Sequence, residues 1–185
     1  ESPAGDPARR HGPFLNDEPN PETSAMFLHL NRNKRGITLS LETKSGQEIF
    51  KKLVKTADVI LESFPPGTME SWGLGEKDLL EMNPKLVFGR LTPFGQTGPY
   101  KDYRGNELIY YAWGPLLSSG DLELGPIKKT LHMVECQVGT AFAMAVMGAL
   151  LAAKLKGIGQ QVDMAAYETQ VGSVDRRASN LLTHQ

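Results

Sequence analysis

The distribution of apolar and polar residues predicts strands that alternate with helices. Residues 37–41 (ITLSL) alternate apolar with small polar side chains, which is typical of a strand. In residues 45–57, apolar side chains recur at helical spacing behind Ser45, a residue type that caps helices. Residues 58–64 and 85–91 are short apolar segments of the kind that form buried strands, and two helical turns separate them. This order indicates an α/β fold, a Rossmann-like parallel sheet with crossover helices.

The second half of the chain continues this alternation. Residues 92–105 are rich in Gly and Pro and predict an irregular loop, and residues 106–117 predict a helix. Residues 156–164 predict a turn followed by a short strand, and a closing helix is predicted over 165–182. Residues 1–24 contain five prolines and predict an extended lead-in, so the expected α/β domain comprises residues 25–185.

A run of 18 residues without a formal charge, 136–153, follows Glu135 directly. Its length would suffice for a membrane span. However, the run contains six Ala and two Gly and few bulky apolar residues. We interpret it as a helix packed closely inside the protein, where small side chains let neighbouring backbones approach, and we expect no membrane partner.

The overall composition narrows the classes of protein further. The chain has 185 residues, a formal charge of −1, 40% hydrophobic and 22% charged residues, as is ordinary for a globular domain. Lys and Arg are not in excess, which argues against a nucleic-acid partner. The single cysteine, Cys136, excludes an internal disulfide and suits a reducing cytoplasm. The four histidines are scattered without the spacing of a metal site, so no metal is expected.

Familiar phosphate cradles and catalytic motifs are absent from the sequence, including the Walker A, GxGxxG, HExxH and GxSxG patterns. Cys136 is either a nucleophile or a buried structural thiol, and we favour the thiol because no histidine stands at a telling spacing. Lys34 and Arg35 within NRNKRG either bind phosphates or belong to a solvated turn. Residues 94–99 (FGQTGP) form either a loop over a ligand or a connector.

Glu135 has two interpretations. It is either a first-turn acid that complements the helix dipole, or a nucleophilic carboxylate held ionised by the free N–H groups of the helix N-terminus. Gly139 and the following alanines would let a thin substrate approach the backbone. Glu107 either faces the same cleft or only caps the helix over 106–117.

Four segments in this order resemble the family III CoA transferases, the CaiB/BaiF group. This group includes formyl-CoA:oxalate and carnitine CoA-transferases and the 2-methylacyl-CoA racemases. The segments are NRNKRGITLSLETKSG, ADVILESFPPGTMESWGLG, NPKLVFGRLTPFGQTGPY and ALLAAKLKGIGQQVDMAAYE. The resemblance implies that the chain is part of that family's large domain, without its opening strand–helix–strand unit and its second domain. It also implies coenzyme A or an acyl-CoA as substrate, a carboxylic acid as acceptor, and a cytoplasmic homodimer.

The resemblance also assigns site residues. The family's catalytic aspartate lies four residues before a glycine, at the start of an Ala-rich helix, where this chain has Glu135. The acid of the family's cleft corresponds to Glu107. The resemblance implies that CoA contacts Leu39, Ser63, Phe64 and Arg104, with Lys34 and Arg35 in the first motif.

The chain departs from the family pattern at several positions. Ser63 stands where an asparagine is usual, and Ser71 where an arginine is frequent. Asn106 occupies the place of the histidine base of the racemases, which makes racemisation the weaker expectation because an amide cannot deprotonate carbon. The expected function is transfer of CoA between an acyl-CoA and a carboxylic acid through a thioester on Glu135. The alternative is a non-catalytic binding or assembly subunit.

Overall fold

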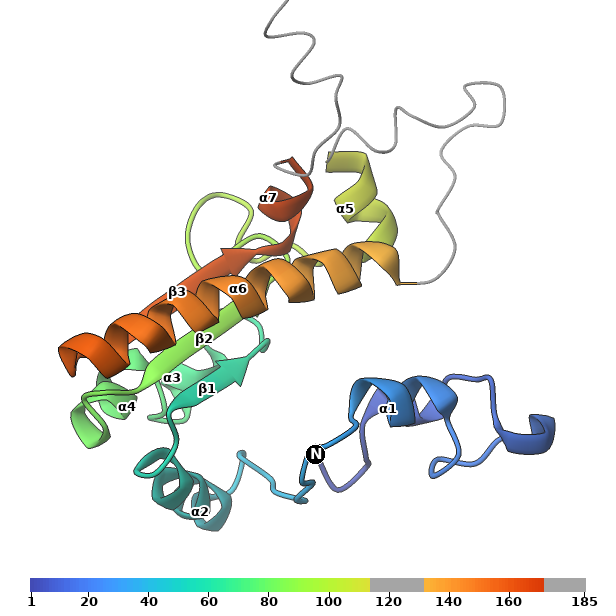
Figure 1. The fold of residues 1–185 in the computed structure, drawn as a ribbon, viewed down its shortest axis with the longest axis horizontal. Helices are drawn as coiled ribbons and strands as arrows, with labels where there is room; N and C mark the ends of the chain where they lie inside the picture. Colours follow the sequence, from blue (N-terminus) through green and yellow to red (C-terminus); the bar gives the residue numbers. More distant parts are fainter. Residues whose placement is uncertain (114–131, 172–185) are drawn as a thin grey trace, which may run out of the picture. The chain divides into compact units, whose positions relative to one another are not determined.

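The computed structural model describes residues 1–113 and 132–171 (Figure 1). These residues belong to two compact units, Glu1–Phe50 and Lys51–Gln185, which we describe separately. The division falls within helix α2 (Lys44–Val54). The boundary after residue 24 that the sequence suggests stays a prediction.

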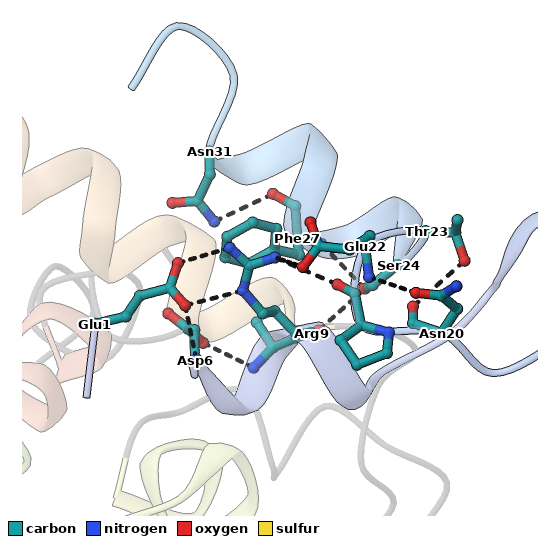
Figure 2. Close-up of polar contacts among 11 residues, drawn as sticks. Glu1, Asp6, Arg9, Asn20, Glu22, Thr23, Ser24, Phe27 and Asn31 are labelled. Atoms are coloured by element: carbon teal, nitrogen blue, oxygen red, sulfur yellow. Dashed lines mark hydrogen bonds and ion pairs between the residues drawn. The ribbon is translucent and has the colours of Figure 1, made fainter. Parts of the chain in front are cut away.

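The first unit consists of short helices and turns. Two 3₁₀ helices, η1 (Pro7–Arg10) and η2 (Leu15–Asp17), precede α1 (Ala25–Leu30), which the sequence pattern did not predict. The hydroxyl of buried Ser24 accepts the N–H of Phe27 at 3.2 Å and so caps α1. Figure 2 shows how Arg9 then holds this region together.

Two predictions for the first unit are wrong. Residues 37–41 lie in the described part of the chain but form no strand: Leu39 N–H donates to Glu1 O, and no ladder continues from this bond. An alternating pattern needs a neighbouring strand before it can become a strand. The cap of α2 is also different, because Gly46 N–H donates to the Thr43 hydroxyl at 3.1 Å, and Ser45 lies inside the helix.

The second unit contains the predicted parallel sheet, in the order β1 (Val59–Glu62), β2 (Val87–Thr92) and β3 (Gln160–Ala165). The connecting and closing helices are α3 (Thr68–Ser71), α4 (Glu76–Met82), α5 (Glu107–Trp113), α6 (Met133–Lys156) and α7 (Ala166–Val171). The Rossmann-like α/β expectation is thereby confirmed. Residues 114–117 and 172–182 of the predicted helices lie outside the described residues.

Helix α6 packs along the sheet through one face (Figure 1). Phe142, Val146, Ala149 and Ala153 form a buried cluster with Val87 of β2. Gly89 is required at the crossing, because a Cβ there would lie 2.8 Å from Phe142 Cζ and 2.7 Å from Leu61 Cδ2. The helix ends at Gly157, whose φ of 73° suits glycine.

Part of α6 remains exposed. Met144, Met147, Leu151 and Leu155 are each more than 60% exposed on the side that the described residues leave uncovered. By length and composition α6 is also apolar enough to cross a membrane. It packs on β2 and β3, and 28% of its apolar 18-residue stretch is buried among the described residues. Cys136 is exposed, so the prediction of a buried thiol is wrong: Val134 and Val138 on either side of it supply the buried face.

Candidate functional site

Glu135 lies in the first turn of α6, at the edge of the sheet where the strands end. Half of its side chain is exposed. The carboxylate lines a cavity of about 350 Å³ whose other walls come from the ends of β1 and β2, from α5 and from the start of α7. The remaining lining residues are Ser63, Leu91, Thr92, Pro93, Tyr110, Val138 and Ala166. Ligands of open parallel sheets bind at this carboxyl edge.

Glu107 is buried, with 4% of its surface exposed, and it lies beneath Glu135. Its Oε1 accepts the N–H of Val134 at 2.9 Å, and its Oε2 accepts the N–H of Glu135 at 3.3 Å. Glu107 therefore caps α6, not the helix in which it stands. The cap of α5 is Asn106, whose Oδ1 accepts the N–H of Ile109 at 3.1 Å. Free N–H groups and the positive end of the helix dipole stabilise a carboxylate in this position.

His132 precedes α6 and contacts Glu135, a contact that the sequence analysis missed. Its Nδ1 lies 2.6 Å from Glu135 Oε2. The only signal in the sequence was a histidine three positions before the candidate nucleophile. The ligand atoms of Glu107, His132 and Glu135 all lie within 4.8 Å of one another, a spacing that a metal ion could bridge. Because the contacts described above already join these groups to each other and to backbone N–H groups, we interpret the cluster as a hydrogen-bonded support for Glu135.

Tyr110 adds a phenol to the same cavity. Burial raises the pKa of Tyr110, and the negative charges of Glu135 and Glu107 raise it further. The phenol therefore stays protonated near neutral pH and keeps its O–H donor. The cavity thus presents the Glu135 carboxylate and a phenol that can donate a hydrogen bond where negative charge develops.

A second cavity of about 500 Å³ adjoins the first and shares Ser63 and Pro93 with it. Phe64 and Arg104 line this second cavity together with Lys101, so three of the predicted CoA contacts, Ser63, Phe64 and Arg104, come together. Asp102 also lines this cavity, so Lys101 and Arg104 give it one net positive charge, which suits a phosphate-bearing ligand. The other predicted contacts, Leu39, Lys34 and Arg35, lie in the unit Glu1–Phe50, where Leu39 is partly exposed and the two basic residues are exposed.

The wall of the second cavity at Phe64 is held by a buried arginine. Arg90 of β2 donates from Nε to Glu62 Oε1 at 2.7 Å, and its NH1 and NH2 groups donate to the two oxygens of Glu70 at 2.7 and 3.1 Å. The other Glu62 oxygen, Oε2, accepts the N–H of Phe64 at 2.6 Å. Sequence reasoning missed this network, because it depends on the register that places Glu62 beside Arg90. Ser71 donates to Thr68 O within α3 at 2.7 Å.

The fold and the site are those of an α/β protein with a parallel sheet and a carboxylate in a cavity at the carboxyl edge of the sheet. The chain belongs to CoA-transferase family III, whose profile matches residues 1–184. It is 36% identical over 183 residues to the succinyl-CoA:(R)-benzylsuccinate CoA-transferase subunit BbsE of Thauera aromatica, covering 96% of this chain and 44% of that protein. It is 34% identical over 181 residues to the succinate–glutarate CoA-transferase of Agrobacterium fabrum, covering 96% and 45%.

Solved structures agree with this assignment. A CaiB/BaiF family protein from Brucella suis superposes with a TM-score of 0.89 at 32% identity, covering 99% of this chain and 49% of that one. A Mycobacterium tuberculosis structure, in an orthorhombic form, gives 0.85 at 34% identity, covering 100% and 50%. The chain thus spans about half the length of the relatives that it matches.

Proposed function

We propose that the protein containing this chain transfers CoA between an acyl-CoA and a carboxylic acid, with Glu135 as the nucleophile. The observation that carries the proposal is the position of Glu135, half exposed in a cavity at the carboxyl edge of the sheet, with its backbone held by buried Glu107. The adjoining cavity with Lys101 and Arg104 would take the phosphate-bearing part of CoA. Succinyl-CoA is the donor named for several relatives, which makes it a suitable first substrate.

The reaction is balanced without an external oxidant or reductant. A Glu135 carboxylate oxygen attacks the thioester carbonyl, the C–S bond breaks, and a mixed anhydride and CoA thiolate result. The thiolate then attacks the Glu135 side-chain carbonyl, so the first acid leaves and a glutamyl-CoA thioester forms. The incoming carboxylate reverses these steps and departs as the new acyl-CoA.

The longer acid sets a geometric demand. Glutamate carries its carboxylate about one C–C bond, ~1.5 Å, farther from the backbone than aspartate does. A misplacement of about 1 Å can cost about 100-fold in rate. Glu135 can serve only if its neighbours fix the longer side chain.

Mass spectrometry of the protein during turnover tests the proposal. With succinyl-CoA present, hydroxylamine should convert the peptide containing Glu135 to a hydroxamate, and borohydride should reduce it to an alcohol. Glu135→Gln should remove both adducts, whereas Glu81→Gln, which changes an exposed acid on α4, should keep them. An unmodified Glu135 in an actively transferring enzyme would overturn its assignment as nucleophile. Absence of any transfer would favour the non-catalytic alternative.

We also propose that the protein is a cytoplasmic homodimer that uses no metal. The exposed apolar side chains of α6 support burial against further protein surface. Sedimentation of the full-length protein measures the assembly: a monomer at micromolar concentration would contradict it. Full activity after treatment with a chelator is expected.

A further inference from the structure

Glu135 is held at both ends. Its backbone N–H donates to Glu107 Oε2 at 3.3 Å, and its side-chain Oε2 contacts His132 Nδ1 at 2.6 Å. The first contact fixes the position of the Glu135 backbone, and the second fixes the orientation of its carboxylate. An ionised carboxylate can only accept hydrogen bonds, so the imidazole must carry its proton on Nδ1 in this contact.

We propose that His132 is a further catalytic residue, the hydrogen-bond donor that holds Oε2 of Glu135 so that Oε1 attacks the thioester. The inference rests on the proposed role of Glu135 as nucleophile. A glutamate at this position has one more rotatable bond than an aspartate, and His132 restrains that bond from within the same turn. His132 thereby supplies the restraint that the longer side chain of Glu135 needs in order to keep its carboxylate in the reactive position.

The same contact serves the later step. When CoA thiolate attacks the Glu135 carbonyl carbon, negative charge develops on Oε2, the bond from that carbon to Oε1 breaks, and Oε1 leaves with the released acid. The Nδ1–H group already lies against Oε2, so it can stabilise this charge without reorganisation. Among the residues that the structure describes, Glu107 and the Tyr110 phenol also lie near Glu135, and both Glu107 oxygens accept backbone N–H groups.

The exposure of the pair makes the experiment practicable. The side chains of His132 and Glu135 are 38% and 50% exposed. Ion pairs in such surroundings contribute little to stability. Substitutions of His132 should therefore leave the fold intact and reveal their effect in the reaction.

Three variants test the donor role, with kcat, the KM for succinyl-CoA and the single-turnover rate of adduct formation on Glu135 as measurements. His132→Leu removes the donor and should lower kcat by about 10- to 100-fold, with little change in KM, since removing one such donor costs up to 10²–10³ elsewhere. His132→Asn keeps an N–H near the Nδ1 position and should stay within about threefold of wild type. Met133→Leu, at an exposed neighbour, is the matched control and should behave as wild type.

A double-mutant cycle adds a second measurement. Glu135→Asp withdraws the carboxylate from His132, so adding His132→Leu to it should cause little further loss. Equal kcat in wild type and His132→Leu would overturn the inference, as would equal damage by Leu and Asn. Failure of the wild-type protein to form any adduct on Glu135 would instead overturn the proposed function, before the variants are compared.

Discussion

Two arginines in this molecule each bind one glutamate through both of its oxygens and a second glutamate through one oxygen, but they differ in burial. Arg9, in the first unit, binds both oxygens of Glu1 at 2.8 and 2.9 Å and one oxygen of Glu22 at 3.1 Å (Figure 2). Arg90, in the second unit, binds both oxygens of Glu70 and one oxygen of Glu62. Each also lies near a phenylalanine ring, 3.8 Å from the Phe27 centroid and 5.3 Å from that of Phe88.

Burial separates these two networks. The Arg9 side chain is 20% exposed and its partner Glu22 is 79% exposed, whereas Arg90 and Glu62 are 5% and 2% exposed. Hydrogen bonds to Glu1 raise the pKa of Arg9. Burial lowers the pKa of Arg90, but hydrogen bonds to Glu70 and Glu62 outweigh it and raise the pKa overall. We therefore expect the cost of losing one partner to depend on whether water can replace that partner.

The largest effect is expected from Arg90→Met, which leaves Glu62 buried without its cation. Removing one partner of a buried ion pair costs about 3–5 kcal/mol. Urea unfolding followed by tryptophan fluorescence should show a loss of this size, because both tryptophans, Trp72 and Trp113, lie in the second unit. The double variant Arg90→Met with Glu62→Leu should recover part of the loss, because no buried charge remains. A single variant within about 1 kcal/mol of wild type would contradict the role of burial.

The second unit shows how far an apolar pattern carries a prediction. Strand β2 was predictable because it is an apolar segment that is buried almost throughout. In β1 and β3 only Glu62 and Ala165 are buried, so burial alone would not have identified these two strands. Residues 37–41 have a comparable pattern and form no strand, since pairing depends on a neighbour that a local pattern cannot specify. The pattern also failed at Cys136: a run without charges does not tell which side of a helix is buried.

The candidate site was also predictable only in part. The resemblance located Glu135, and the structure placed Ser63, Phe64 and Arg104 around adjoining cavities. The capping of α6 by Glu107 was not predictable, because it joins two helices separated by a long segment. His132 was also missed, since the donor role of a histidine follows from a side-chain direction rather than from spacing.

A smaller effect is expected from Glu70→Gln, and it should depend on pH. Hydrogen bonds from Arg90 lower the pKa of Glu70 below its ordinary 4.5. The ionised form therefore adds stability above about pH 4.5, and this contribution is lost as the pH falls through the lower folded pKa. The melting temperature of wild type should fall more steeply below about pH 4.5 than that of Glu70→Gln.

The control for this pH series is Glu81→Gln, which removes an exposed acid that does not contact Arg90. It should keep the steep wild-type slope. Nearly half of the Glu70 side chain is exposed, so water can weaken its pairing with Arg90. Parallel curves of melting temperature against pH for wild type and Glu70→Gln would show that this pair does not stabilise the protein.

The smallest effect is expected from Arg9→Gln, the counterpart of Arg90→Met. Water can solvate Glu1 and Glu22 once the guanidinium is gone, so no buried charge is left unpaired. Hydrogen exchange should rise in residues 1–30, while the urea transition reported by tryptophan fluorescence stays as in wild type.

Added salt should shrink the difference in hydrogen exchange between Arg9→Gln and wild type, because it screens exposed charges. Arg9→Lys keeps the charge but not the bidentate geometry, so any protection that it restores measures charge alone. If Arg9→Gln instead lowered the stability to urea as far as Arg90→Met does, contact geometry rather than burial would determine how much these networks stabilise the protein.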